Sequence, residues 1–327
     1  MTRKLDEIRD IEASVRGRLA NVARAQNRDF GFTLRLYFLE RFLYRLSASR
    51  YRESFLLKGA LLFFARAEDD ARPFARPTKD IDLEALAMQP DFDKLKAIFA
   101  AIAVVDSPRD GTRFDPKSIT IETIREDDRY GGIRLHMDAY LARAHDRIQI
   151  DIGFGDAVTP GPVALTYPTL LTTVPAPDLS AYPVETVIAE KWEATVSLGE
   201  ANTRLKDIVD LEDLARRESF DGAAVQNALR RTFERRKTPI ELDAAVFTKA
   251  YRDDRERQSL WSAARKRLQR TDAPESFAEA MSRVLGFIEP LHRAAAAGET
   301  FAGRWDPSVR QWRRDGGPAG LANRRLS

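Results

Sequence analysis

A chain of 327 residues is long enough for one domain with helical extensions or for two modest domains, with a well-buried core. The absence of cysteine excludes disulfides, Cys-ligated zinc, iron–sulfur clusters and thiol catalysis, and it is consistent with a cytoplasmic location. The 53 Lys and Arg residues are nearly balanced by 50 Asp and Glu residues, so any nucleic-acid binding must depend on a local basic patch.

The apolar stretches are far shorter than a membrane-spanning helix requires. The opening residues 1–7 are followed by alternating charges instead of the apolar core of a secretory signal. We therefore expect a protein that neither spans a membrane nor is secreted through a classical signal.

Residues 1–50 contain two apolar patterns with helical spacing. Leu5, Ile8 and Ile11 begin the first pattern, and a second one runs through residues 32–43. We predict an N-terminal helical segment over 1–50 that packs on the core of the protein.

A strand is expected to turn into a helix at Gly59. The apolar residues 55–57 precede this turn, and a second apolar run at 61–65 follows it. Such a turn offers backbone N–H groups and the positive end of a helix to a phosphate. We predict that Lys58, Gly59 and Ala60 bind a nucleotide.

Two carboxylates follow on the next expected strand. Asp80 and Asp82 are two positions apart, so both side chains project from the same face of a strand. The two groups repel one another, and a divalent cation relieves the repulsion. Hard oxygen ligands favour Mg²⁺, or Mn²⁺ in its place. Thr78 shares this face and could bond a ligand or cap the strand, whereas Arg76 could hold a phosphate or brace the carboxylates.

The following region indicates a small sheet. We expect a helix over 92–105, strands over 118–125, 131–141 and 147–154, and a polar turn over 127–132. Antiparallel hairpins with few crossover helices favour an α+β fold with a mixed, antiparallel-rich sheet. The core is expected to span 51–175.

The first motifs resemble those of a known superfamily. A Gly-small pair, a spacer and then Asp-x-Asp resemble motif I of the DNA polymerase β-like nucleotidyltransferases. Lys58-Gly59 together with Arg76-x-Thr78-x-Asp80-Ile81-Asp82-Leu83 is similar, more narrowly, to the AbiEii/AbiGii abortive-infection toxin family. That family usually has Gly, Ser or Thr where this chain has Ala60, which offers no hydroxyl.

The resemblance implies a third carboxylate on a neighbouring strand. Asp151 lies between two isoleucines, where an Asp is costly to bury unless it meets a cation or a hydrogen-bond donor. In the family, this residue would bind the metal and help to deprotonate the attacking hydroxyl. Asp138 is the rival for this place. His136 and His145 lie in the same strand region, and we expect core or surface histidines there.

A proline-rich connector over 174–183 leads into helices. The helix expected after Pro183 carries Ala189-Glu190-Lys191, and residues 204–211 follow as Arg-Leu-Lys-Asp-Ile-Val-Asp-Leu. Both segments resemble later motifs of the same family, so that the resemblance covers roughly half of the chain, residues 55–215.

The later motifs imply roles for several charged residues. Lys191 would meet the triphosphate as a point charge, and Arg204 and Lys206 are expected to contact the nucleotide. Asp207 is the better match for the acidic residue that supports the lysine or the substrate. Asp210 is one turn away on the same face and stays an alternative.

Two further parts complete the expected organisation. Residues 176–300 form a helical domain, and 301–327 form a basic, partly flexible tail whose arginine-rich end frays.

A basic helix is the best candidate for contacts with a nucleic-acid backbone, although a solvated face explains it as well. Its basic residues are Arg230, Arg231, Arg235, Arg236 and Lys237.

The leading hypothesis is a Mg²⁺-dependent nucleotidyltransferase that moves a nucleoside monophosphate from an NTP to an acceptor hydroxyl. The resemblance implies an RNA 3′ end, most plausibly of tRNA, as the acceptor, and a toxin–antitoxin or phage-defence setting with a cognate antitoxin as partner. The alternatives are a non-catalytic module that binds nucleic acid or an antitoxin, and a nucleotidyltransferase that modifies a small molecule. The sequence does not identify the NTP, the acceptor or the oligomeric state.

Overall fold

The computed structural model describes residues 2–66, 78–124, 131–268, 270 and 272–313, and residues 2–10 by their backbone alone. The chain divides into two compact units, which are described separately. The first comprises residues 1–156 and 162–182, and the second comprises residues 157–161 and 183–327. The four-part division expected from the sequence stays a prediction.

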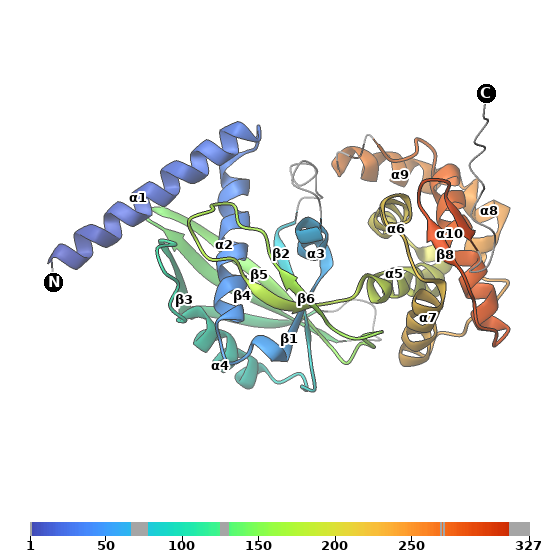
Figure 1. Cartoon of the computed structure of the whole chain (residues 1–327), viewed down its shortest axis with the longest axis horizontal. Helices are drawn as coiled ribbons and strands as arrows, with labels where there is room; N and C mark the ends of the chain where they lie inside the picture. Colours follow the sequence, from blue (N-terminus) through green and yellow to red (C-terminus); the bar gives the residue numbers. More distant parts are fainter. Residues whose placement is uncertain (1, 67–77, 125–130, 269, 271, 314–327) are drawn as a thin grey trace, which may run out of the picture. The chain divides into compact units, whose positions relative to one another are not determined.

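The first unit contains the N-terminal helices and a seven-stranded sheet, coloured from blue to yellow-green in Figure 1. In chain order its elements are α1 (Thr2–Ala25), α2 (Phe30–Ser47), η1 (Arg52–Ser54), β1 (Phe55–Lys58), α3 (Gly59–Arg66), β2 (Asp80–Ala85), α4 (Phe92–Ala103), β3 (Thr112–Ile124), β4 (Gly132–Leu141), β5 (Ala144–Phe154), β6 (Val163–Thr166) and β7 (Asp178–Ala181).

The strands follow the order β3-β4-β5-β2-β1-β7-β6. β2 pairs with β5, and β1 with β7, in parallel, while the other neighbours are antiparallel. The expected fold class, α+β with a mixed and antiparallel-rich sheet, N-terminal helices and C-terminal helices, is confirmed.

Alternation along the strands gives the sheet one apolar face. In β4, buried residues from Ile133 to Leu141 alternate with half-buried ones, as expected for a sheet covered on one side. Helices α2 and α4 supply aromatic side chains to this core. The ring of Phe42 stacks on Phe99 at 6.0 Å, and Phe99 meets Phe55 of β1 edge-on at 5.3 Å.

A buried ion pair ties α2 to the start of β3. Arg45 Nη1 donates to Asp110 Oδ2 at 2.7 Å, and both side chains are almost completely buried. Asp110 Oδ1 also accepts from the backbone N–H of Thr112 at 2.8 Å, and Arg45 Nη2 donates to the Thr112 carbonyl at 3.0 Å.

The second unit is mainly helical. Its elements are α5 (Val184–Leu198), η3 (Gly199–Ala201), α6 (Leu205–Arg217), α7 (Gly222–Arg236), η4 (Ala245–Phe247), α8 (Lys249–Arg252), α9 (Arg255–Arg267), α10 (Phe277–Ala296), β8 (Arg304–Asp306) and β9 (Gln311–Arg313).

The core of the second unit contains a buried polar contact. Trp192 of α5 donates through Nε1 to His292 Nδ1 of α10 at 3.1 Å, and His292 Nε2 lies 2.8 Å from the Glu241 carbonyl. Burial lowers the pKa of His292, which fits a neutral ring that accepts on one side and donates on the other.

Residues 304–313, the described part of the expected basic tail, are folded against the second unit. Strands β8 and β9 form a hairpin, and Trp305 is buried with its indole N–H donating to the Ala215 carbonyl of α6. Trp312 donates to the Phe287 carbonyl of α10 at 2.8 Å. Indole rings with satisfied N–H groups anchor this segment, whereas residues 314–327 lie outside the described part of the chain.

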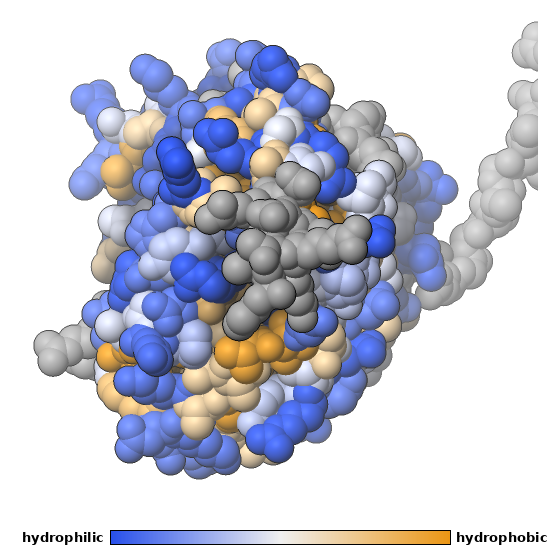
Figure 2. Space-filling view, turned by 90° about the vertical axis from the view of Figure 1, so that its left-hand side faces the viewer, coloured by the Kyte–Doolittle hydropathy of each residue, from blue (hydrophilic) through white to orange (hydrophobic). Residues whose placement is uncertain are grey.

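The face of the molecule shown in Figure 2 is mostly hydrophilic, and hydrophobic residues gather in a limited area toward its lower part. Among the described residues, we find no helix with the length and apolar character needed to cross a membrane.

We expect Arg45→Met to lower the free energy of unfolding by about 3–5 kcal/mol, because it leaves the Asp110 carboxylate buried without its cation. Denaturant unfolding followed by circular dichroism measures this loss. Arg52→Met removes the exposed pair with Glu53 in the same unit and should change stability by less than about 1 kcal/mol. Equal effects of the two substitutions would contradict the structural role given to the buried pair.

Candidate active site

A row of charged side chains crosses the polar face of the sheet. In register, Lys58 of β1 pairs with Asp82 of β2, and Asp82 pairs with Asp151 of β5. Asp151 in turn pairs with Arg134 of β4. Side chains directly opposite each other in neighbouring strands share a face, so two carboxylates lie between two cations.

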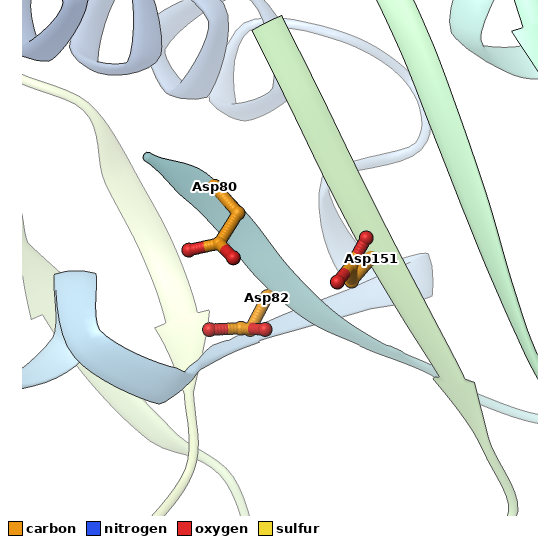
Figure 3. Close-up of side chains that lie close together, drawn as sticks. All are labelled: Asp80, Asp82 and Asp151. Carbon is orange, nitrogen blue, oxygen red and sulfur yellow. The ribbon is translucent and has the colours of Figure 1, made fainter. Parts of the chain in front are cut away.

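Asp80 joins this row to complete a cluster of three carboxylates. Asp80, Asp82 and Asp151 each offer an oxygen atom, and these atoms lie within 4.8 Å of one another. Figure 3 shows Asp80 and Asp82 on β2 and Asp151 on the neighbouring strand β5. All three are partly exposed to solvent. The cluster arises because β2 and β5 are parallel neighbours with Asp82 and Asp151 in register.

Thr78 orients the first carboxylate. Its hydroxyl donates to Asp80 Oδ1 at 2.6 Å, and the Thr78 residue is buried. The sequence left open whether Thr78 bonds a ligand or caps the strand. In the structure its hydroxyl bonds a residue of the cluster. Arg76 lies outside the described residues.

The second carboxylate packs against the glycine turn. Gly59 has φ +68°, and a Cβ placed on it would lie 1.7 Å from Asp82 Oδ2. Only glycine leaves this space and adopts this conformation readily. Gly59 is also the first residue of α3, whose first turn presents N–H groups that have no acceptor within the helix. Ala60 follows in that turn and is buried.

Lys58 is held by two other carboxylates. Its ammonium lies 2.8 Å from Glu84 Oε2 and 3.4 Å from Asp156 Oδ2. Glu84 is buried and also accepts from the backbone N–H of Asp156 at 2.8 Å. A Cβ on Gly153 would lie 2.5 Å from Glu84 Oε2 and 2.6 Å from Lys58 Nζ. Glycine at this position therefore leaves room for the buried pair.

Arg134 and Gln149 hold the third carboxylate. Arg134 donates through Nε to Asp151 Oδ1 at 2.9 Å and through Nη2 to Oδ2 at 2.8 Å. Gln149 Nε2 lies 3.1 Å from both oxygens. The hydrogen bond to Asp151 raises the pKa of Arg134, burial opposes it, and the charges of Asp151, Glu122 and Asp80 add to the rise.

Asp138 and the two histidines of this strand region interact with residues outside the carboxylate cluster. Asp138 accepts from Arg147 Nη1 at 2.8 Å and is not a member of the carboxylate cluster. His145 Nε2 lies 3.6 Å from Asp138, and His136 Nε2 lies 3.6 Å from Glu122. The structure therefore brings Asp151 to the Asp80–Asp82 pair, and not Asp138.

Sequence reasoning missed Glu84, Arg134, Gln149 and Asp156. Glu84 continues the two-residue alternation of Asp80 and Asp82, which was a usable signal. Arg134 alternates with buried residues in β4, yet its pairing with Asp151 depends on strand register, which the sequence does not state.

The second unit contains the later motifs. Lys191 of α5 lies 2.6 Å from Asp207 Oδ1 and 2.7 Å from Asp210 Oδ2, both on α6. Arg204 Nε donates to Asp207 Oδ2 at 3.1 Å. Both candidate acidic residues therefore contact the lysine.

Charges around Asp207 overcome its burial. Burial alone would raise the pKa of Asp207, but the charges of Lys191 and Arg204, the hydrogen bond from Lys191 and the charge of Lys206 together lower it below its ordinary value. Asp207 is therefore ionised near neutral pH, as a partner of the buried ammonium must be.

The carboxylate cluster fits a divalent cation. Three hard oxygen ligands converge from two adjacent strands, and their partial exposure leaves room for water or phosphate oxygens. Like charges at this range repel strongly unless a cation lies among them.

Comparisons with known proteins agree with this chemistry. The model of a family described as "Nucleotidyl transferase AbiEii toxin, Type IV TA system" matches residues 41–283. A search of curated proteins gave no match.

Two crystal structures from Helicobacter pylori are similar to the chain. JHP933 is 13% identical, with a TM-score of 0.40, and the match covers 79% of this chain and 90% of JHP933. A protein described as a candidate nucleotidyltransferase is 13% identical, with a TM-score of 0.39, and the match covers 80% of this chain and 95% of the other.

The protein is a nucleotidyltransferase, as the resemblance of its motifs to that superfamily implied. Because the family match extends over most of the chain, the protein belongs to the AbiEii family of nucleotidyltransferase toxins of type IV toxin–antitoxin systems.

We expect Gly59→Ala to weaken Mn²⁺ binding at the cluster by about tenfold or more, because the new Cβ displaces the Asp82 carboxylate. Electron paramagnetic resonance of free Mn²⁺ measures the affinity. Gly199→Ala is the matched control, since Gly199 also has positive φ but no atom within 4 Å of an added Cβ. Unchanged Mn²⁺ affinity in folded Gly59→Ala would show that the turn does not position Asp82.

Proposed function

We propose that the protein transfers a nucleoside monophosphate from an NTP to an acceptor hydroxyl, with Mg²⁺ bound by Asp80, Asp82 and Asp151. The observation that carries this proposal is the convergence of these three carboxylates within 4.8 Å, beside the glycine turn into α3. Nucleotidyl transfer needs a metal clamp, a positioned nucleophile and positive charge near the phosphates.

The three carboxylates share the cation in this proposal, and Asp151 has a second task. When bound, Mg²⁺ neutralises charge on the triphosphate and on the attacking oxygen. Asp80, oriented by Thr78, and Asp82, packed against Gly59, hold the cation. Asp151 orients the acceptor hydroxyl and accepts its proton. The paired contacts of Asp151 with Arg134 support this task, because they limit its rotation.

The triphosphate is proposed to meet backbone and side-chain donors. The first turn of α3, at Gly59 and Ala60, offers N–H groups and the positive helix end. Because Ala60 has no hydroxyl, the contact there comes from the backbone. Lys191 is the proposed ammonium contact, and its two carboxylate partners keep it charged and oriented.

The acceptor is proposed to be the 3′ end of an RNA, namely tRNA. Family membership supports a toxin that acts on a cellular target and is neutralised by a cognate antitoxin. Helix α7 supports contact with an RNA backbone, because Arg230, Arg231 and Arg235 are exposed on it. Arg236 is turned inward and donates to Glu193 at 2.8 Å.

A cavity of about 560 Å³ lies beside the basic helix α7 within the second unit. The loop over residues 157–160 forms one wall, and α7 contributes Asn227, Arg231, Glu234 and Arg235. The loop is anchored on α5, because Thr159 donates its N–H to Thr186 Oγ1 at 2.8 Å and accepts from it at 2.9 Å. Two arginines one turn apart in a hollow suit a phosphodiester.

We expect Asp80→Ala or Asp82→Ala to lower transfer by about a thousandfold or more, because losing a metal ligand removes several kcal/mol of transition-state stabilisation. The assay combines purified protein with labelled NTPs, Mg²⁺ and total tRNA, and follows label on RNA, protein and small molecules. Asp138→Asn is the control on the same sheet and should retain activity. Wild type that labels no acceptor would refute the proposal.

We expect the double substitution Arg231→Gln and Arg235→Gln to weaken tRNA binding by about tenfold and to lower the slope of log affinity against log salt by about 1–2, through lost phosphate contacts. Filter binding at several salt concentrations measures both. Lys266→Gln with Arg267→Gln removes equal charge from exposed positions of α9. Equal losses from both pairs would show a general charge effect instead of a site on α7.

A further inference from the structure

The third carboxylate is already in contact with a cation of the protein. Arg134 faces Asp151 across the antiparallel ladder of β4 and β5 and engages both carboxylate oxygens, at 2.9 and 2.8 Å. A forked pair of this kind combines charge with fixed geometry. The oxygens that would ligate a metal ion therefore share their lone pairs with a guanidinium.

Lys58 lies in the same row, next to Asp82 in register. Its ammonium is paired with Glu84 and Asp156, so it faces two carboxylates of its own. Arg134 is in direct contact with the cluster through Asp151, and its side chain is 31% exposed against 16% for Asp151. At this exposure, charge interactions are reduced by solvent but not abolished.

Two physical effects of Arg134 on a metal ion follow from this geometry. A guanidinium beside a cation site repels a divalent ion and competes for the oxygens of Asp151. The same two hydrogen bonds hold the carboxylate in one orientation, together with the contacts of Gln149 Nε2 at 3.1 Å. Removing Arg134 should therefore tighten metal binding and, at the same time, loosen the orientation of Asp151.

We propose that Arg134 is a positioning residue for Asp151 that also serves as the internal counter-cation of the cluster. It keeps the affinity for a free divalent ion low, and tight metal binding then requires the negative charge of the bound triphosphate. This inference rests on the proposed function, because it assigns the order in which the same site gains metal and nucleotide.

Mn²⁺ titration without nucleotide tests the proposal directly. We expect Arg134→Gln to bind Mn²⁺ about tenfold more tightly than wild type, because the competing charge is gone. Arg134→Lys keeps the charge but loses the fork, so its affinity should lie between the two. Arg147→Gln removes the comparable cross-strand pair with Asp138 and should match wild type.

Adding a non-hydrolysable NTP provides the second readout. The triphosphate should tighten Mn²⁺ binding by wild type more than by Arg134→Gln, so the difference between the two proteins shrinks. In the transfer assay, Arg134→Gln should lower kcat with little change in the KM for NTP, since Asp151 is no longer held. Arg134→Lys should restore part of kcat.

Several outcomes would overturn the proposal. Folded Arg134→Gln with wild-type or weaker Mn²⁺ affinity would show that Arg134 does not compete with the metal. If circular dichroism shows that Arg134→Gln does not fold, Arg134→Lys provides the test instead. The proposal requires Arg134→Lys to bind Mn²⁺ more tightly than wild type, and equal or weaker binding would overturn it. Wild type that binds no Mn²⁺ even with nucleotide would also end the proposal.

The titration separates this inference from the function on which it rests. Mn²⁺ affinity is measured without turnover, so wild type that transfers no nucleotide would refute the proposed function alone. Conversely, normal transfer by wild type with equal Mn²⁺ affinities in all Arg134 variants would refute only the role of Arg134.

Discussion

Crowding of negative charge on β2 and β5 is the constraint on which the rest of the site depends. Asp82 and Asp151 are paired in register, and Asp80 lies one pleat away on the same face. Carboxylates this close are stable as anions only with cations or donors beside them. The surrounding structure supplies such groups in the form of the Thr78 hydroxyl and the guanidinium of Arg134.

The apolar face of the sheet makes this arrangement possible. Because alternate residues of β2, β4 and β5 are buried, a shift of one residue in register would expose the whole apolar set. The stacked rings contributed by α2 and α4 oppose such a shift. Packing on one face therefore fixes the positions of the charged side chains on the other. A site built on paired strands is also more rigid than one built on loops.

In the second unit the charge that needs compensation is positive, that of the Lys191 ammonium. Lys191 is only 15% exposed, and a half-buried ammonium is more stable when carboxylates compensate its charge. Asp207 and Asp210 lie three residues apart on α6 and both reach it. Lys191 is therefore paired with two carboxylates, which suits an ammonium proposed to meet a polyphosphate. The same helix spacing explains why sequence reasoning preferred Asp207 by its match to the family motif and still kept Asp210 as an alternative.

The sequence by itself determined the local elements and the chemistry of single residues. Short spacings predicted the local elements around Asp80, Asp82 and the glycine turn. The family was expected from the resemblance of these motifs and their order to a known family, and the family match confirms it. The tertiary structure alone decided which strand lies beside which. Strand register places Asp151, and not Asp138, beside Asp80 and Asp82. It also places Arg134 opposite Asp151, and Lys58 forms an ion pair with Glu84. Pairing between distant segments depends on the packing of the whole sheet, and no local pattern encodes it.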